Sequence, residues 1–266
     1  MSSEQLWLRE DFRCFWQGQD AFAAAFTVRG DSVRALEQRQ TLAFELGGQR
    51  YFIKRHRGAR WAEIFKNLVQ GRLPVISARN EYRALCALDQ LGVRVPVPAA
   101  YGRRGWLPHM LASFLVTEDV GPHQSLEDLC RDWRTQPPVF ALKRDLIRRV
   151  ATIARTLHGN GICHRDFYLC HFLRTSDGKL TLIDLHRALV KRHLPQRWII
   201  KDLAGLYFSA LDCGLTRRDL LRFMREYHHG ALRQTLQRDA VFWRRVLHRA
   251  QRIHDREQRK TQPLSV

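Results

Sequence analysis

Hydrophobic and polar positions alternate along the first part of the chain, as they do in half-buried β-strands. The alternation covers Val33–Leu36 and Thr41–Leu46, and a third strand-like stretch, Tyr51–Arg55, follows the pair Gly47-Gly48. Two glycines between such stretches predict a tight hairpin turn. The apolar run Phe114–Thr117 predicts one more buried strand. These residues favour an antiparallel sheet near the N-terminus.

Apolar residues at helical spacing follow this strand-rich region. Trp61–Val69 forms one such segment, and Ser77 is placed to cap a second helix whose apolar stripe includes Leu85 and Leu88. The segment from Pro96 to Pro108 is rich in proline and glycine, and we expect it to be a loop.

The later part of the chain is dominated by helical patterns. A helix is predicted over Leu142–Leu157, and helices are expected to fill most of the remainder, including a basic amphipathic segment over Leu232–Ile253. Two short strands, Phe172-Leu173 and Leu180–Ile183, flank an Asp177-Gly178 turn.

This order of elements predicts an α+β fold with two lobes. Residues 1–121 would form a small β-rich N-lobe, and residues 122–266 a larger helical C-lobe. A length of 266 residues is enough for both lobes to share one catalytic domain.

The chain is strongly basic, with 45 Lys and Arg against 26 Asp and Glu and a formal net charge of +19. Such a field attracts nucleic acid, an anionic membrane leaflet, a phosphorylated glycolipid or an acidic protein, and charge alone does not choose among them. No RNA-binding aromatic motif or helix-turn-helix signature is present, so no specific nucleic acid is expected.

The acidic N-terminus has no apolar signal region, and we expect a cytoplasmic protein.

A set of polar residues occurs in the order of the catalytic elements of protein kinases. His164-Arg165-Asp166 follows the predicted helix Leu142–Leu157, and Asp184 comes eighteen residues after Asp166 at the end of a strand. Upstream, Lys54 lies on a strand and Glu81 on the following helix. The arrangement predicts phosphoryl transfer from ATP on a protein-kinase-like fold.

Each part of that chemistry has a candidate residue. Asp166 would orient the acceptor hydroxyl and accept its proton, and Asp184 would hold Mg²⁺ on the β- and γ-phosphates. Lys54, fixed by Glu81, would hold the α- and β-phosphates. Further contacts to the nucleotide are expected from Arg39, from the Glu118 carbonyl and from the Val120 amide.

Simpler interpretations exist for the single residues. Asp166 alone would be a turn residue, Lys54 a solvated strand charge, and Glu81 a member of a surface ion pair. Asp202 is either an ordinary acidic residue near a helix start or an internal anchor of the catalytic loop, to which His164 and Arg165 also contribute. Cys163-His164 and Cys170-His171 lack the spacing of a structural zinc site.

The sequence departs from protein kinases at several positions. His171 stands where kinases have a metal-binding asparagine, and imidazole is a poor ligand for Mg²⁺, so its metal role is doubtful. Leu185-His186 follows Asp184 in place of Phe-Gly. Residues 185–201 contain no Ser, Thr or Tyr, and the loop Glu37–Gln40 contains no glycine. Protein substrates are therefore disfavoured, and Arg39 would compensate for the missing glycine loop.

Four segments of the chain resemble the lipopolysaccharide core heptose(I) kinases of Gram-negative bacteria. They are His164–Leu173, Ile183–Arg187, Lys201–Ser209 and Phe52–Gly58, and the resemblance runs nearly end to end.

This resemblance implies that the γ-phosphate of ATP is transferred to the 4-hydroxyl of the first heptose of the inner core. The acceptor would be an anionic, lipid-linked glycolipid at the cytoplasmic face of the inner membrane, with peripheral contact between protein and membrane. Asp166 corresponds to the catalytic aspartate of the family. His186, Arg187, Lys191 and Arg192 are our candidates for contacts to acceptor phosphates, and the segment Arg60–Val69 is a candidate for lipid contact.

Three alternatives remain open from the sequence. A protein kinase acting on tyrosine is the first, and a basic nucleic-acid-binding protein with an inactive kinase-like lobe is the second. Charge also admits docking of a small acidic protein such as an acyl carrier protein.

Overall fold

The computed structural model describes residues 4–36, 39–58, 77–107, 110–230 and 232–261. Contacts within the chain group these residues into two compact units. Unit 1 comprises residues 1–90, 95–121 and 184–187, and unit 2 comprises residues 91–94, 122–183 and 188–266. This grouping also divides the chain after residue 121, as the predicted lobes do. It differs from the predicted lobes in the assignment of two short segments. Residues 91–94 belong with the helical unit, and residues 184–187, which include Asp184, belong with the sheet unit.

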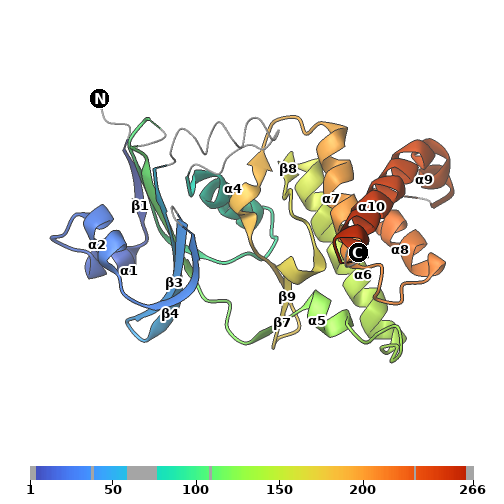
Figure 1. Ribbon diagram of the computed structural model, residues 1–266, viewed down its shortest axis with the longest axis horizontal. Coiled ribbons are helices and arrows are strands. Elements are labelled where there is room, and N and C mark those ends of the chain that lie inside the picture. Colours follow the sequence, from blue (N-terminus) through green and yellow to red (C-terminus); the bar gives the residue numbers. More distant parts are fainter. Residues whose placement is uncertain (1–3, 37–38, 59–76, 108–109, 231, 262–266) are drawn as a thin grey trace, which may run out of the picture. The chain divides into compact units, whose positions relative to one another are not determined.

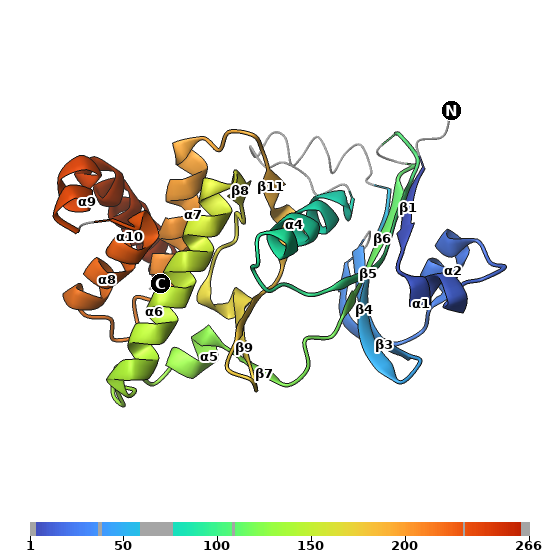
Figure 2. The ribbon, with the colours of Figure 1, turned by 180° about the vertical axis from the view of Figure 1, so that it is seen from behind.

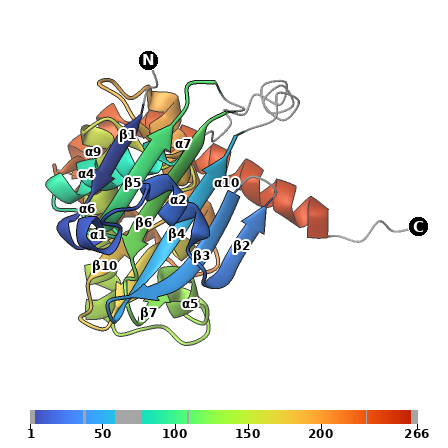
Figure 3. The ribbon, with the colours of Figure 1, turned by 90° about the vertical axis from the view of Figure 1, so that its left-hand side faces the viewer.

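Unit 1 is built on a six-stranded antiparallel sheet with the order β1-β5-β6-β4-β3-β2 (Figure 3). The strands are β1 (Gln5–Leu8), β2 (Asp31–Leu36), β3 (Arg39–Leu46), β4 (Gln49–Arg57), β5 (Pro98–Arg104) and β6 (Ala112–Glu118). Gly47 and Gly48 connect β3 to β4 with φ angles of +59° and +76°. These left-handed conformations favour glycine, which explains the predicted hairpin at that position.

Helices cover both faces of this sheet. The short helices α1 (Glu10–Phe15) and α2 (Ala21–Thr27) lie across one face, and α4 (Arg79–Gln90) lies on the other (Figure 1). A hydrophobic core lies against the first face and includes Phe12, Phe22 and Phe114. The rings of Phe22 and Phe114 meet edge to face. On the second face, Ser113 of β6 accepts a hydrogen bond from the Ala78 amide at 3.0 Å, which fixes the start of α4.

Unit 2 consists mainly of helices, seen in Figure 2. They are α5 (Leu126–Cys130), α6 (Phe140–Gly159), α7 (Gln196–Ser209), α8 (Arg217–His228), α9 (Leu232–Arg238) and α10 (Ala240–Thr261). The buried stripe of α6 contains Leu146, Val150, Ala154 and Leu157, which recur at the helical spacing seen in the sequence.

Short strands connect these helices and carry the loop around Asp166. A three-stranded sheet, β10-β9-β7, is formed by β7 (His123–Ser125), β9 (Phe172–Thr175) and β10 (Leu180–Leu182). A two-stranded sheet pairs β8 (Ile162–Cys163) with β11 (Leu189–Val190). The 3₁₀ turns η1 (Leu169–His171) and η2 (Leu185–Arg187) follow β8 and β10 in the chain.

The sequence predicted the α+β class correctly and several elements wrongly. The segment expected to be a loop from Pro96 to Pro108 contains β5, whose Ala99, Ala100 and Tyr101 are buried against neighbouring elements. Its one proline within the strand is the first residue, Pro98, where a missing amide is tolerated. β1, α1 and α2 are too short to give a clear periodic pattern.

The basic C-terminal segment is also different from the prediction. It forms two helices, α9 and α10, which are separated at Asp239. The predicted helix Trp61–Val69, and with it the proposed lipid contact of that segment, lies outside the described residues. Among the residues described, no helix is long and apolar enough to cross a membrane.

Candidate functional site

Unit 1 carries an ion pair among the candidate residues. Lys54 Nζ on β4 lies 2.5 Å from Glu81 Oε1 in the first turn of α4. The Glu81 side chain is 5% exposed and the Lys54 side chain 25% exposed, so the carboxylate is buried while the ammonium reaches partly into solvent. A buried carboxylate that is fixed by a helix holds the lysine in one orientation. The prediction that these two residues pair is confirmed.

A cavity of about 50 Å³ surrounds Lys54. Strand pairing explains its lining, since Thr41 is directly opposite Lys54 and Arg39 is directly opposite His56. Residues in such positions share one face of a sheet, and residues two apart on a strand do as well. The remaining lining comes from Gln40, Arg55, Asp184 and His186. The structure thus brings Arg39, Lys54, Asp184 and His186 together within unit 1.

Asp184 occupies an unusual backbone conformation in this cavity. Its φ angle is +62°, in the left-handed region that non-glycine residues rarely adopt. Its Oδ1 atom contacts Nδ1 of His186, the second residue of the η2 turn that packs against α4. Such conformations persist where the surroundings hold them, and they are frequent at functional sites.

His56 is a member of the cavity that the sequence analysis missed. Its side chain is buried, and burial together with the charges of Arg39, Lys54 and His186 lowers the pKa of His56 to about 3. The ring is therefore neutral at pH 7 and adds no positive charge beside Arg39 and Lys54. The predicted strand ended at Arg55, whereas β4 continues to Arg57 and so places His56 on the same face as Lys54.

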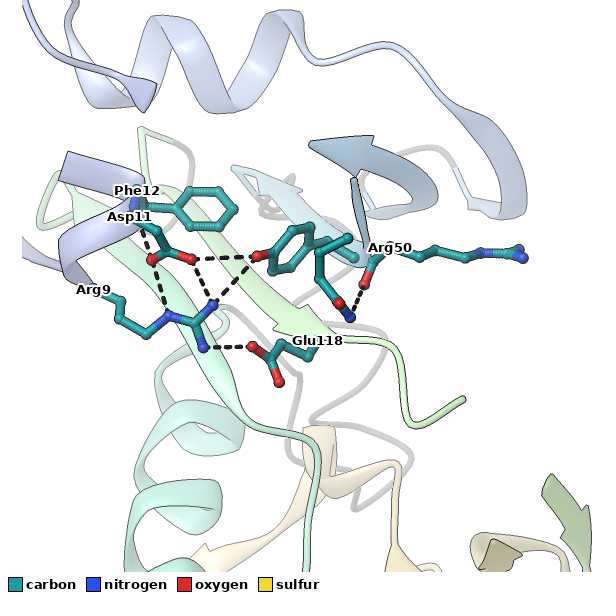
Figure 4. A network of polar contacts seen from close by, with 7 residues as sticks. Arg9, Asp11, Phe12, Arg50 and Glu118 are labelled. Carbon is teal, nitrogen blue, oxygen red and sulfur yellow. Dashed lines mark hydrogen bonds and ion pairs between the residues drawn. The ribbon is translucent and has the colours of Figure 1, made fainter. Parts of the chain in front are cut away.

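The end of β6 carries the residues expected to contact the base. The Glu118 amide donates to Val97 O at 2.9 Å, and the next amide, of Asp119, donates to Arg50 O at 3.0 Å. Arg9 Nη1 donates to Glu118 Oε1 at 2.7 Å, as Figure 4 shows. The backbone that leads to the half-buried Val120 is therefore held from both sides.

Arg9 is the centre of this arrangement. Its guanidinium also donates to both carboxylate oxygens of Asp11, at 2.9 and 2.6 Å, and this hydrogen bonding holds the pKa of Asp11 below its ordinary value. No pattern in the sequence pointed to Arg9, because its partners Tyr51 and Glu118 are distant in sequence and are brought to it only by folding.

Unit 2 carries the loop around Asp166, and a buried carboxylate organises this loop. Asp202, on α7, is fully buried and accepts hydrogen bonds from the backbone amides of His164 at 2.7 Å and Arg165 at 2.8 Å. Asp202 is therefore the internal anchor of the loop. The alternative of an ordinary acidic residue near a helix start is wrong, because α7 begins at Gln196, six residues before Asp202.

Asp202 has a further partner that was not predicted. Nε2 of His158 on α6 lies 3.5 Å from Asp202 Oδ2, and Nδ1 of His158 lies 2.9 Å from the hydroxyl of Tyr227 on α8. Burial acts to raise the pKa of Asp202, but hydrogen bonding from His158 and the charges of His158 and His164 hold that pKa below its ordinary value. The carboxylate thus remains ionised in the interior.

Two histidines tie the loop to the chain before Asp184. His164 Nε2 lies 2.9 Å from Ile183 O, and the Ile183 amide donates to His171 O at 3.0 Å. His171 Nδ1 lies 2.7 Å from the carbonyl oxygen of Asp166, and the two imidazole rings stack with centroids 5.5 Å apart. Arg165 adopts φ +74°, which turns the backbone just before the half-buried Asp166.

These contacts change the interpretation of His171. Its Nδ1 atom is engaged by the backbone of the loop itself. The structure places His171 as a support of the Asp166 backbone.

The residues present suit a magnesium ion that is held mainly by substrate oxygens. Mg²⁺ commonly binds proteins through one or two carboxylates together with phosphate oxygens and water. Asp184 supplies one carboxylate beside Lys54 and Arg39, which are placed to hold phosphate. No cluster of three or more His, Cys, Asp or Glu side chains that could hold a metal by itself occurs in the described part of the chain.

The four candidates for acceptor contacts do not all fall in one unit. His186 lines the cavity beside Asp184, and Arg187 ends the same 3₁₀ turn in unit 1. Lys191 and Arg192 belong to unit 2, where the Lys191 amide donates to Gly161 O at 2.9 Å.

Unit 2 also contains an apolar cavity of about 110 Å³ that the sequence did not indicate. It is enclosed by α5, α6, α7, α8 and α10, with Leu126, Val150, Leu206, Met224, Trp243 and Val246 among its lining residues. These positions share no pattern in sequence beyond the apolar faces of their helices.

A lysine fixed by a buried glutamate, and an aspartate loop anchored by a buried carboxylate on the following helix, are parts that protein-kinase-like phosphotransferases share. Comparison with known proteins agrees with this class. The model of the lipopolysaccharide kinase (Kdo/WaaP) family matches residues 23–227. The chain belongs to this family.

Relatives of this chain in two organisms are both described as lipopolysaccharide core heptose(I) kinases. The lipopolysaccharide core heptose(I) kinase WaaP of Escherichia coli is 43% identical over 261 residues, covering 96% of this chain and 98% of that protein. The corresponding kinase of Pseudomonas aeruginosa is 44% identical over 262 residues, with the same coverage of 96% and 98%. The protein is therefore a kinase with an alcohol acceptor that acts in lipopolysaccharide core heptose phosphorylation.

A solved structure supports the fold. It is described as WaaP in complex with acyl carrier protein, and it matches with a TM-score of 0.81 at 40% identity, covering 93% of this chain and 98% of that chain. The expectation of a bilobal α+β kinase-like fold is confirmed.

The Asp202 anchor gives a prediction for stability. Replacing Asp202 by Asn keeps the shape but leaves one of two buried amides facing an NH₂ group, so the free energy of unfolding should fall by about 3 kcal/mol. Urea denaturation at pH 7 measures this loss. Asp212→Asn, at an exposed position, is the control and should change it by less than about 0.5 kcal/mol.

The pH dependence provides an independent check. Because folding lowers the pKa of Asp202, its contribution is present above the unfolded pKa of about 3.9 and is lost as the pH falls through the folded pKa. The difference between wild type and Asp202→Asn should persist from pH 8 to pH 5 and shrink below about pH 4. Equal stability of Asp202→Asn and Asp212→Asn at pH 7 would contradict the anchor role.

Proposed function

We propose that this kinase transfers the γ-phosphate of ATP to the 4-hydroxyl of the first heptose of the lipopolysaccharide inner core. The observation that carries the proposal is the Asp202-anchored loop, which fixes the backbone on both sides of Asp166. The identity to heptose(I) kinases over nearly the whole chain supports the acceptor class.

ATP binding is assigned to residues of unit 1. Lys54, held by Glu81, would contact the α- and β-phosphates, and Arg39 would add a second cation from the neighbouring strand. The Glu118 carbonyl and the Val120 amide would contact adenine at the end of β6. Neutral His56 supplies a hydrogen-bonding group to the same cavity without adding charge.

Asp184 is the residue that would hold Mg²⁺, which when bound neutralises charge on the transferring phosphoryl group. His186 orients the Asp184 carboxylate through its contact with Oδ1. Ile183, bonded to Asp184 in the chain, is fixed by His164 and His171.

Asp166 would act on the acceptor. Its carboxylate accepts a hydrogen bond from the sugar hydroxyl, orients that oxygen toward the γ-phosphorus, and takes the proton as the O–P bond forms. His186, Arg187, Lys191 and Arg192 remain our candidates for the anionic groups of the acceptor, because inner-core glycolipids carry carboxylates and phosphates. We place the reaction at the cytoplasmic face of the inner membrane, where ATP and a lipid-linked acceptor meet.

The test is phosphate transfer from labelled ATP and Mg²⁺ to a deacylated inner-core oligosaccharide that lacks heptose phosphate. Asp166→Asn should lower kcat by about 10² to 10⁴-fold, the range for removal of a general base. Asp89→Asn, at an exposed position on α4, is the matched control and should act at the wild-type rate. NMR of the product should locate the phosphate on O-4.

Three results would count against the proposal. Transfer by Asp166→Asn at the control rate would remove Asp166 from the reaction. Phosphate on another hydroxyl would correct the position. Transfer to tyrosine peptides and not to the oligosaccharide would favour a protein kinase.

We further propose that a small acidic acyl carrier protein binds this kinase. The net charge of +19 and the solved complex of a relative with acyl carrier protein support it. The apolar cavity of unit 2 suits an acyl chain, because most of its lining side chains are aliphatic or aromatic.

Binding of carrier protein with acyl chains of increasing length tests this partner. Each additional buried CH₂ group should strengthen binding by about 0.8 kcal/mol, up to the length that fills the cavity. Isothermal titration with the free-thiol carrier is the control. Equal affinity for the acylated and free-thiol forms would place the acyl chain outside the cavity.

A further inference from the structure

α10 carries a row of arginines that the kinase reaction does not use. Its members are Arg245, Arg249, Arg252, Arg256 and Arg259, which we call the arginine stripe. The separations are four, three, four and three residues, so all five lie on one side of the helix. At 1.5 Å per residue the stripe is about 21 Å long.

The stripe faces solvent because the opposite side of α10 is packed. Trp243, Val246 and Ala250 on that side are 6%, 2% and 0% exposed, and α10 lies along α7. All five arginines of the stripe are exposed. In Figure 3 the last turns of α10 extend away from the other helices.

The charge of the stripe is not balanced on its own helix. α10 contains two carboxylates, Asp255 and Glu257, which accept from Gln251 at 2.8 Å and from Lys260 at 2.7 Å. Arg245 donates to the neutral Gln196 side chain at 3.5 Å. Among the described residues, no carboxylate lies within ion-pair distance of any of the five arginines. Five like charges on one face destabilise a helix by mutual repulsion, so an anionic surface that covers them would stabilise it.

The chemistry of the stripe favours a layer of phosphates over a protein partner. Protein interfaces depend on buried aromatic and aliphatic anchors, with charges at the rim. Val241, at the start of α10, is the one exposed apolar side chain in line with the stripe within the described residues. The apolar side of α10 is used inside the unit, so the helix does not insert into lipid. A protein can bind a flat array of anionic headgroups without an apolar anchor, because each Lys or Arg near that surface contributes on the order of 1 kcal/mol to the binding free energy.

We propose that the arginine stripe of α10 docks the kinase on the anionic headgroups of a lipid bilayer. The proposal rests on the proposed function in one respect, since a lipid-linked acceptor brings the enzyme to such a surface. It assigns the contact to the polar side of α10 and requires no membrane-inserted segment.

The test is co-sedimentation of the full-length chain with vesicles of 70% phosphatidylcholine and 30% phosphatidylglycerol, compared with phosphatidylcholine alone. The wild type should bind the anionic vesicles only, and 0.5 M salt should release it, because salt screens exposed charges. The double variant Arg252→Gln/Arg256→Gln should bind about 30-fold more weakly, because the loss of each arginine weakens binding about 5-fold and the two factors multiply. Replacement of both by Lys should retain binding, since charge and not guanidinium geometry carries the contact.

Arg217→Gln with Arg218→Gln is the matched control. These exposed arginines begin α8, so the pair removes the same charge from another part of unit 2. The control should bind vesicles as the wild type does. Equal weakening of the control and stripe variants would overturn the proposal in favour of net charge alone, and unchanged binding by the stripe variant would overturn it outright. If the stripe variant lost an acyl carrier protein and kept the vesicles, the arginines would serve a protein partner instead.

Activity separates this proposal from the proposed function. The stripe variant should phosphorylate deacylated acceptor at the wild-type rate and lose about ten-fold or more on lipid-bearing acceptor in anionic vesicles. Equal activity of wild type and stripe variant on the vesicles would overturn the docking role. The vesicle-binding measurement contains no acceptor and no ATP, so a failure of phosphate transfer would leave its result standing.

Discussion

The buried carboxylate of Asp202 is the interaction on which the catalytic loop depends. Its two oxygens accept from consecutive amides, and this holds Arg165 in a left-handed conformation that its side chain alone would disfavour. Asp166 follows directly, and its carbonyl is bound in turn by His171. One buried carboxylate in unit 2 thus fixes the backbone at Asp166, the residue that we propose as the catalytic base.

The same principle operates in unit 1 with a different partner. Glu81 is buried and places Lys54, while the strand pairing of β3 with β4 puts Arg39, Thr41 and His56 beside it. Positive charge is concentrated around a neutral histidine, and Asp184 supplies the single carboxylate. The cavity can therefore hold an anion and one metal without a dedicated cage of protein ligands.

Sequence reasoning found the parts of this site that are fixed by order along the chain. Lys54, Glu81, Asp166 and Asp184 follow the kinase order, and Asp202 has the place of an anchor after them. Residues that only folding brings together were missed. His158 and Tyr227 come from separate helices to reach Asp202, and Arg9 reaches Glu118 across more than a hundred residues.

The fold was predicted where apolar periodicity is long, as in α6 and β3, and missed where elements are short. β5 was not predicted because it contains a proline and a glycine. The strand accommodates the proline as its first residue, Pro98, and the glycine, Gly102, where it packs against an aromatic ring. Gly102 illustrates this, because a Cβ at that position would lie 2.3 Å from Phe114 Cε1. The packing of Phe114 requires that glycine, and local turn propensity has no part in it.

The central proposal is that unit 1 binds the nucleotide through Lys54, and that Asp166 acts on the acceptor hydroxyl and takes no part in nucleotide binding. Isothermal titration of a non-hydrolysable ATP analogue with Mg²⁺ tests it most directly. Lys54→Met should weaken binding by about ten-fold or more, because a charge-assisted contact to phosphate is lost. Asp166→Asn should bind as the wild type does. Equal affinity of Lys54→Met and wild type would contradict the account.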